Sequence, residues 1–248
     1  MNKRIFSLAQ MNECSIMELF DLYKNDSGEL FKMYIKNRQI SGTYKMILVV
    51  VGILALLNNM GIFKGSFCLD FFYKFTNLSN LVLIIYLLLA AARQLGGMEK
   101  DAFPWKAGVK HALMLAISVT CLIAHFMLNG GLVFTDGAFH PSMLVLHYIV
   151  PIGAILDWIL FDEKGTMKLY EPFLWTIFPL AYLAYSYIMV TVFSVEMGEG
   201  SRWPYPFLDA DINGSAKVAG TILLLLIIFL ALGFLYTAID RRLAKRSK

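Results

Sequence analysis

Six long apolar stretches, separated by short polar connections, dominate the pattern of this chain. Each stretch has about 20 residues or more, enough for a helix to cross a hydrocarbon core of roughly 30 Å. Buried strands would be shorter, and the strands of a membrane barrel would alternate apolar with polar positions. The pattern therefore predicts six transmembrane helices, at residues 44–63, 71–92, 107–129, 141–161, 172–195 and 215–239.

The short connections predict that neighbouring helices pack antiparallel in one compact bundle. The expected fold class is all-α, a polytopic membrane protein with a six-helix transmembrane domain over residues 44–239. Residues 1–43 are expected to be a cytoplasmic segment, whose amphipathic stretch 16–23 either lies on the membrane surface or belongs to a partly ordered lead-in. Residues 240–248 are expected to form a basic cytoplasmic tail.

Composition and charge agree with a membrane protein. Hydrophobic residues make up 58% of the chain and charged residues 16%, whereas a soluble domain has about 25% charged residues. Eighteen Lys and Arg residues fall on one predicted side of the bundle and four on the other, which are Lys64, Lys74, Arg202 and Lys217. The positive-inside rule then predicts that both termini are cytoplasmic and that the protein is multi-pass in the cell (plasma) membrane.

The same composition argues against several other classes of protein. The net charge of +4 comes without a basic cluster of the kind that binds nucleic acid. The three cysteines fall in three different compartments, so they predict neither a disulfide framework nor a structural metal site. No cofactor is expected, and nothing in the sequence predicts an oligomeric state.

Polar residues gather at one depth of the predicted bundle. Such residues are costly in hydrocarbon, about 2.5–3.5 kcal/mol when charged, and are therefore candidates for function. Thr76, Asn77 and Asn80 open the second span, His125 closes the third, and His147 lies near the start of the fourth. The helical rise places these residues roughly 7–9 Å below the same membrane surface, in the outer third of the bilayer.

The types of these residues suggest specific roles. A threonine hydroxyl needs a nearby base to act as a nucleophile, and Thr76 with His147 would supply the two groups. His147 could equally be a structural hydrogen-bond donor or a ligand. The amides of Asn77 and Asn80 would either donate to an oxyanion or join helices by hydrogen bonds. Asp157 lies about 15 Å further along the helix, too far to orient His147, and is expected to pair near the cytoplasmic surface.

Two further features border this region. Tyr182 and Tyr185 share one face of the fifth span at a spacing of three, so their hydroxyls either reach the site or their rings pack in the bundle. The connection 196–214 carries two prolines among aromatic residues, which is typical of an ordered lid or of an anchor in the membrane interface.

Three short motifs resemble those of a known family. They are Phe-Thr-Asn-Leu-Ser-Asn at 75–80, His-Tyr-Ile-Val-Pro at 147–151 and Trp-Pro-Tyr-Pro-Phe at 203–207. Together they resemble a bacterial six-helix membrane family, which is distantly similar in turn to the androgen-induced and androgen-dependent membrane hydrolases of animals. Those enzymes cleave fatty-acid esters of hydroxy fatty acids with an intramembrane threonine and histidine. The resemblance implies that Thr76 is the nucleophile, that His147 is its general base, and that the protein lies in a bacterial inner membrane.

The first hypothesis for function is therefore an intramembrane lipid ester hydrolase, or an acyltransferase in which an alcohol replaces water. Its substrate would be a membrane lipid or another amphiphilic ester, attacked by Thr76 with His147 as the base. The residues expected to bind the substrate or its oxyanion are Asn77, Asn80, His125, Tyr182 and Tyr185.

Two alternatives remain open at this stage. A non-catalytic binder or transporter of a small amphiphile would use Thr76, Asn80, His147 and Tyr185 as the lining of its site. A b-type haem protein would use His125 and His147 as two axial ligands, although no second histidine pair exists to support it.

Overall fold

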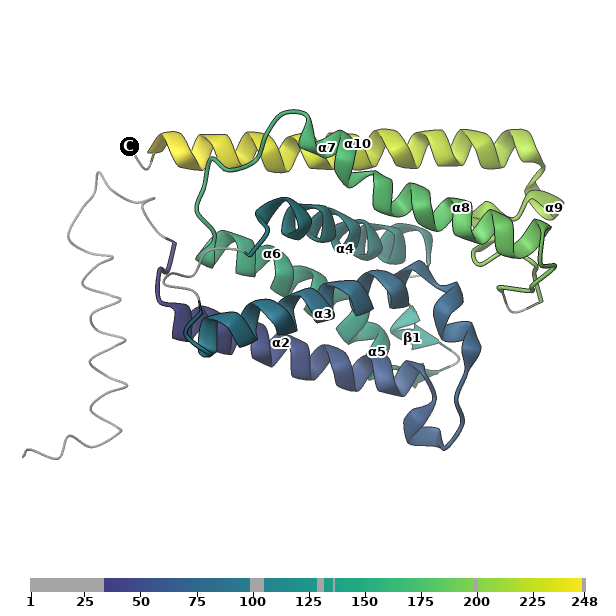
Figure 1. Cartoon of the computed structure of the whole chain (residues 1–248). Coiled ribbons are helices and arrows are strands. Elements are labelled where there is room, and N and C mark those ends of the chain that lie inside the picture. Colours follow the sequence, from purple (N-terminus) through teal and green to yellow (C-terminus); the bar gives the residue numbers. More distant parts are fainter. Residues whose placement is uncertain (1–33, 99–104, 129–131, 136, 199, 247–248) are drawn as a thin grey trace, which may run out of the picture.

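The computed structural model describes residues 34–98, 105–128, 132–135, 137–198 and 200–246, and these residues are mostly helical (Figure 1). Within them, six helical segments are long and apolar enough to cross a membrane, which confirms the all-α, six-span prediction. The helices are α2 (Arg38–Asn59), α3 (Phe75–Leu95), α4 (Ala107–Met127), α5 (Pro141–Leu144), η4 (Val145–Ile149), α6 (Val150–Phe161), α7 (Glu171–Trp175), α8 (Ile177–Thr191) and α10 (Ser215–Arg246). The predicted amphipathic stretch 16–23 lies outside the described residues.

Short elements fill the connections at one end of the bundle, the end at which α3, α5 and α10 begin (Figure 1). The two short strands pair antiparallel, with Phe134 opposite Phe139 and Thr135 opposite Ala138. These elements are η1 (Ile62–Lys64), η2 (Leu69–Tyr73), β1 (Phe134–Thr135), β2 (Ala138–Phe139), η5 (Pro206–Leu208) and α9 (Ala210–Asn213). Ordered connections at this end can therefore carry side chains into the bundle.

Two helices begin at residues other than those predicted. α2 begins earlier because the side chain of Asn37 accepts hydrogen bonds from the backbone amides of Gln39 and Ile40, at 2.9 and 3.2 Å. α3 begins later, because Lys74 is extended (φ −98°, ψ 129°) and ends the short helix η2. Thr76 is consequently the second residue of α3. The predicted span, 71–92, would have placed it more than one turn after the start of the helix.

The apolar interior has two parts, with α4 between them. Leu113 and Ile117 of α4 pack in a cluster with α2, α3 and α6. Met114, Leu115 and Val119 of the same helix pack in a second cluster with residues of α7 and α10. By contrast, only 28% of the apolar window of the α7–α8 segment and 17% of that of α10 is buried. These two segments therefore lie at the periphery of the bundle, where most of their surface is free to face lipid.

Two glycines allow α2 to approach its neighbours closely. A Cβ atom on Gly52 would lie 2.4 Å from Cδ1 of Ile84 in α3. A Cβ atom on Gly153 of α6 would lie 2.6 Å from Cδ2 of Leu48 in α2. Small residues at such contacts are what allow membrane helices to pack tightly in the absence of a hydrophobic driving force between them.

A cluster of buried charges joins three helices at the other end of the bundle, where α2 and α4 begin and α6 ends. The ammonium of Lys45 lies 2.8 Å from the carboxylate of Asp157, and that of Lys110 lies 2.5 Å from both Asp157 and Asp162. Lys45 also donates to the hydroxyl of Ser41 at 2.6 Å. The four charged side chains are at most 3% exposed, and their charges sum to zero. Because the charges balance, burying the four side chains costs less free energy, and their ion pairs join α2, α4 and α6.

Replacing Asp157 with Asn should strongly destabilise the fold. The variant leaves Lys45 and Lys110 facing a neutral amide, and breaking one partner of a buried charge pair costs about 3–5 kcal/mol. Thermal unfolding in detergent, followed by tryptophan fluorescence, should show a clearly lower midpoint. Lys64→Gln, which removes an exposed charge, is the matched control. Equal midpoints for the wild type and Asp157→Asn would contradict the role assigned to the cluster.

The stability should also depend on pH through Asp162, which lies just outside the fourth span. Burial disfavours the charged carboxylate and raises its pKa to about 6. Between about pH 4 and pH 6 the unfolded chain has lost this proton and the folded chain holds it, so raising the pH lowers stability. The unfolding midpoint of the wild type, measured relative to that of Asp162→Asn, should fall over this interval and then level off. A difference that stays constant from pH 4 to pH 7 would refute this prediction.

Candidate functional site

The structure brings Thr76 and His147 together in the interior of the bundle. Oγ1 of Thr76 lies 3.2 Å from Nε2 of His147, across the contact between α3 and η4. The two residues are 9% and 3% exposed, so bulk water has little access to this hydrogen bond. When Nδ1 carries the proton of the neutral ring, Nε2 is an acceptor and can take the hydroxyl proton. The distance is within the range expected for a nucleophile and its base.

The backbone around His147 has an unusual form with an identifiable cause. Residues Val145–Ile149 form a π-helical turn, in which the amide of Val150 bonds to the carbonyl of Val145. The next bond in this register would join residue 151 to the carbonyl of Leu146, but Pro151 has no N–H group. The side-chain amide of Asn80 donates to that carbonyl instead, at 3.0 Å. Asn80 thus satisfies the backbone directly beside His147.

The two asparagines make structural contacts in this structure. The Nδ2 group of Asn80 also donates to the carbonyl of Thr76 at 2.8 Å, so both of its hydrogens have acceptors. Nδ2 of Asn77 donates to the carbonyl of Phe71 at 2.9 Å, and its Oδ1 accepts from the side chain of Asn59 at 3.1 Å. In this arrangement the side-chain amides of Asn77 and Asn80 join segments of the bundle by hydrogen bonds. This is the second of the two roles that the sequence suggests for them, the first being donation to an oxyanion.

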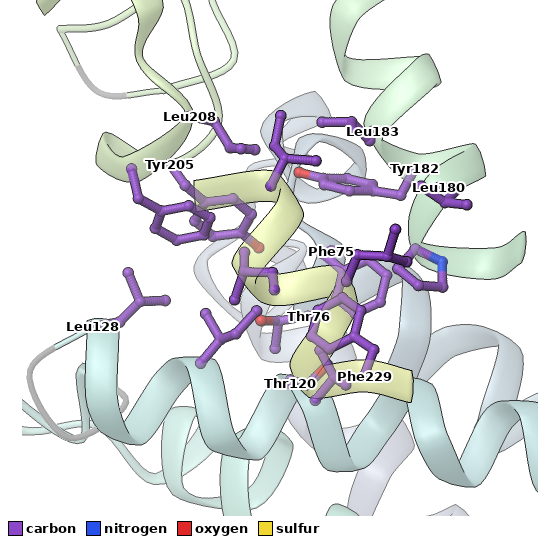
Figure 2. Close-up of a pocket in the computed structure, with 17 residues that line it drawn as sticks. Phe75, Thr76, Thr120, Leu128, Leu180, Tyr182, Leu183, Tyr205, Leu208 and Phe229 are labelled. Atoms are coloured by element: carbon purple, nitrogen blue, oxygen red, sulfur yellow. The ribbon is translucent and has the colours of Figure 1, made fainter. Parts of the chain in front are cut away.

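Thr76 also lines a narrow cavity of about 80 Å³, which Figure 2 shows in close-up. Its walls come from α3, α4, α8, α10 and the connection before α10, and all but four of its 17 lining residues are apolar. The polar residues are Thr76, Thr120, Tyr182 and Tyr205. Leu180 of the wall is 43% exposed, so the lining of the cavity extends to the outer surface of the bundle. An apolar chain could therefore occupy a space that begins at the Thr76 hydroxyl.

The remaining predicted residues lie in different places. Tyr182 lines the cavity, and its hydroxyl donates to the carbonyl of Tyr73 at 2.7 Å. The hydroxyl of Tyr185 is directed to the carbonyl of Phe72 at 3.4 Å. His125 is exposed, and its Nδ1 lies 3.2 Å from the hydroxyl of Tyr148. The structure therefore brings Tyr182 close to Thr76, and it places Tyr185 and His125 outside the residues that line the cavity.

Tyr205 and Thr120 line the cavity, although sequence reasoning did not select them. Tyr205 belongs to the Trp-Pro-Tyr-Pro-Phe motif. The prolines and aromatic residues of this motif predicted an ordered connection, but they did not single out Tyr205 as a residue of the site. Oγ1 of Thr120 in α4 lies 3.0 Å from the hydroxyl of Ser79 on α3. The apolar pattern of the third predicted span does not mark Thr120 as a residue of the site. Only the tertiary structure brings Tyr205 and Thr120 to the cavity that Thr76 lines.

A wider groove of about 860 Å³, whose lining mixes apolar with charged side chains, adjoins the cavity at the end of the bundle. Phe207 lines both spaces, and Lys74, which directly precedes α3, lines the groove. Lys217 and Asp209 also border it, so the groove offers charged and polar atoms where the cavity offers apolar ones. The two spaces meet at Phe207; Thr76 lines the cavity, and the charged side chains border the groove.

The histidines do not form a pair at this site. His147 faces Thr76 in the interior, whereas His125 is exposed and contacts Tyr148, the neighbour of His147 on a different side of the helix. Over the part of the chain that the structure describes, no group of three or more His, Cys, Asp or Glu residues is arranged to hold a metal ion. The geometry thus gives no support to two axial ligands for one haem.

Comparisons with known proteins identify no family for this chain. No family model, no curated protein and no solved structure matches it. The resemblance of the three motifs to a bacterial six-helix membrane family therefore stays a prediction.

The contact between Asn80 and Leu146 can be tested by a pair of substitutions. Asn80→Leu leaves the buried carbonyl of Leu146 without a donor, which should lower the free energy of unfolding by about 1–3 kcal/mol. Adding Pro151→Ala supplies a backbone N–H in the same turn, and should recover part of that loss. Unfolding midpoints in detergent would measure both effects. A double variant no more stable than Asn80→Leu would show that the missing donor is not what matters.

Proposed function

We propose that this protein is an intramembrane hydrolase of lipid or other amphiphilic esters, with Thr76 as nucleophile and His147 as general base. The observation that carries the proposal is the 3.2 Å contact between Oγ1 of Thr76 and Nε2 of His147, and Thr76 also lines an apolar cavity. An unassisted threonine hydroxyl is a poor nucleophile at neutral pH, and an adjacent imidazole is the usual way to activate it.

The reaction follows from this pair. Oγ1 of Thr76 attacks the ester carbonyl carbon while Nε2 of His147 takes the hydroxyl proton, and the carbonyl oxygen becomes an oxyanion. The oxyanion collapses, the C–O bond to the alcohol breaks, and His147 gives its proton to the departing alcohol. Water then attacks the acyl-threonine by the same steps and releases a carboxylic acid. If an alcohol replaces water, the same residues transfer the acyl group instead.

The two adjoining spaces support an amphiphilic substrate. The cavity between α4, α8 and α10 would hold part of an acyl chain, because nearly all of its lining is apolar. The charged side chains that border the groove, such as Lys74 and Lys217, would contact the polar end of the substrate. The scissile carbonyl would then lie beside the Thr76 hydroxyl, at the wall of the cavity.

The second candidate is a binder or transporter of a small amphiphile that performs no chemistry. The same apolar cavity and the groove beside it favour this candidate, since neither space requires a reaction. The two candidates differ in a single property, the reactivity of the Thr76 hydroxyl.

Labelling of the purified protein by a fluorophosphonate probe would test that reactivity. An activated hydroxyl displaces fluoride from the probe and forms a stable covalent adduct. Thr76→Ala should abolish labelling, and His147→Ala should slow it about 10²–10⁴-fold because the general base is lost. Thr76→Ser should still be labelled because it keeps a hydroxyl at this position.

Thr191→Ala serves as the matched control, since it removes an exposed hydroxyl at the end of α8. Each variant should first be shown to elute as a folded species in detergent. Labelling that persists in folded Thr76→Ala, or a wild type that is never labelled, would exclude the hydrolase mechanism. In the second case, retained binding of a fluorescent fatty acid would favour the binder or transporter.

A further inference from the structure

The hydroxyl of Tyr205 shares the cavity with Thr76, although the two residues are far apart in the sequence. Tyr205 comes from the connection between α8 and α10, and is 8% exposed. Figure 2 shows its ring entering the cavity from that connection, with the hydroxyl directed to the interior. A ligand group held beside Oγ1 of Thr76 would therefore also lie near this hydroxyl.

The surroundings of the Tyr205 hydroxyl are those of a neutral hydrogen-bond donor. Burial raises the pKa of the phenol, while interactions with the side chain and amide of Thr76, the amide of Phe75 and the side chain of Tyr182 act in the opposite direction. A phenol already holds its proton at neutral pH, and burial favours this neutral form. The amides of Phe75 and Thr76 lie in the first turn of α3, where no earlier helical carbonyl is available to them.

The position of Tyr205 is fixed by the residues around it. Its ring stacks on that of Phe207, with centroids 5.2 Å apart and planes at 6°. The ammonium of Lys74 lies 5.6 Å from the centre of the same ring and donates to the carbonyl of Pro204 at 2.8 Å. Pro204 and Pro206 restrict the backbone on either side. The connection is thus attached directly to the residue that precedes α3.

The next turn of the connection is also well anchored. Asp209 caps α9 by accepting from the amides of Asp211 and Ile212, at 2.9 and 3.0 Å, and it accepts from the hydroxyl of Ser201 at 2.7 Å. The hydrogen bond from Ser201, together with the two backbone amides, holds the pKa of this carboxyl below its usual value. A donor that stabilises a transition state must be placed in advance, and this network provides such placement.

We propose that Tyr205 is a third catalytic residue, which donates a hydrogen bond to the ester carbonyl oxygen as that oxygen becomes an oxyanion. The inference rests on the proposed hydrolase function. When Thr76 attacks, the electron pair of the carbonyl moves to the oxygen, and the O–H group of Tyr205 stabilises the new charge without giving up its proton. This assigns to Tyr205 the role first expected of Asn77 or Asn80.

Tyr205→Phe tests the proposal because it removes the hydroxyl and keeps the ring. Hydrolysis of p-nitrophenyl butyrate by the full-length protein in detergent would provide kcat and KM. Removing one oxyanion donor costs about 10²–10³-fold in kcat, so Tyr205→Phe should show a loss of this size with KM changed little. The pH dependence should keep the limb that reports His147, since the base is intact.

Tyr187→Phe is the matched control, because it removes the hydroxyl of an exposed tyrosine on α8. A folded Tyr205→Phe variant with kcat within threefold of the wild type would overturn the inference. A rise in KM with kcat unchanged would also overturn it, because the hydroxyl would then contribute only to binding. If Thr76→Ala keeps its activity, the proposed function itself fails, and that outcome is separate from either result for Tyr205.

Discussion

Inside a bilayer, each polar group must find its partner within the protein, because hydrocarbon offers none. The arrangement of this bundle follows from that requirement at both of its ends. At one end, two lysines and two aspartates neutralise one another across α2, α4 and α6. At the other end, the hydroxyl of Thr76 bonds to the imidazole of His147, and the side-chain amides of Asn77 and Asn80 donate to backbone carbonyls. The apolar clusters fill the space between these ends.

Pro151 illustrates how one missing donor shapes the proposed site. Without its N–H group the helix widens into a π-turn, and the carbonyl that this turn leaves free is satisfied by Asn80 from α3. Asn80 lies one turn after Thr76, so the same contact sets the spacing between the helix that carries the hydroxyl and the turn that carries the imidazole. π-Turns are frequent at functional sites for this kind of reason, since they direct side chains in ways that a regular helix does not.

Sequence reasoning predicted the parts of this architecture that depend on local pattern. The six spans follow from length and apolarity, and the shared depth of Thr76 and His147 follows from the helical rise. The start of α3 was placed too early because Phe71 and its neighbours are as apolar as the helix they precede. Tyr205 could not be predicted, because its approach to Thr76 depends on how the connection before α10 folds. The catalytic roles of these residues stay predictions, since no comparison bears on them.

The small buried fraction of the α7–α8 segment and α10 has a consequence for how any ligand reaches Thr76. These segments form much of the cavity wall, and most of their surface is free to face lipid. A ligand that passes between them would come sideways from the acyl-chain region and would never cross bulk water. Its occupancy would then follow its mole fraction among the membrane lipids, not its concentration in solution. Dilution with inert detergent or lipid at constant total ligand would weaken apparent binding, as for enzymes that work on two-dimensional substrates.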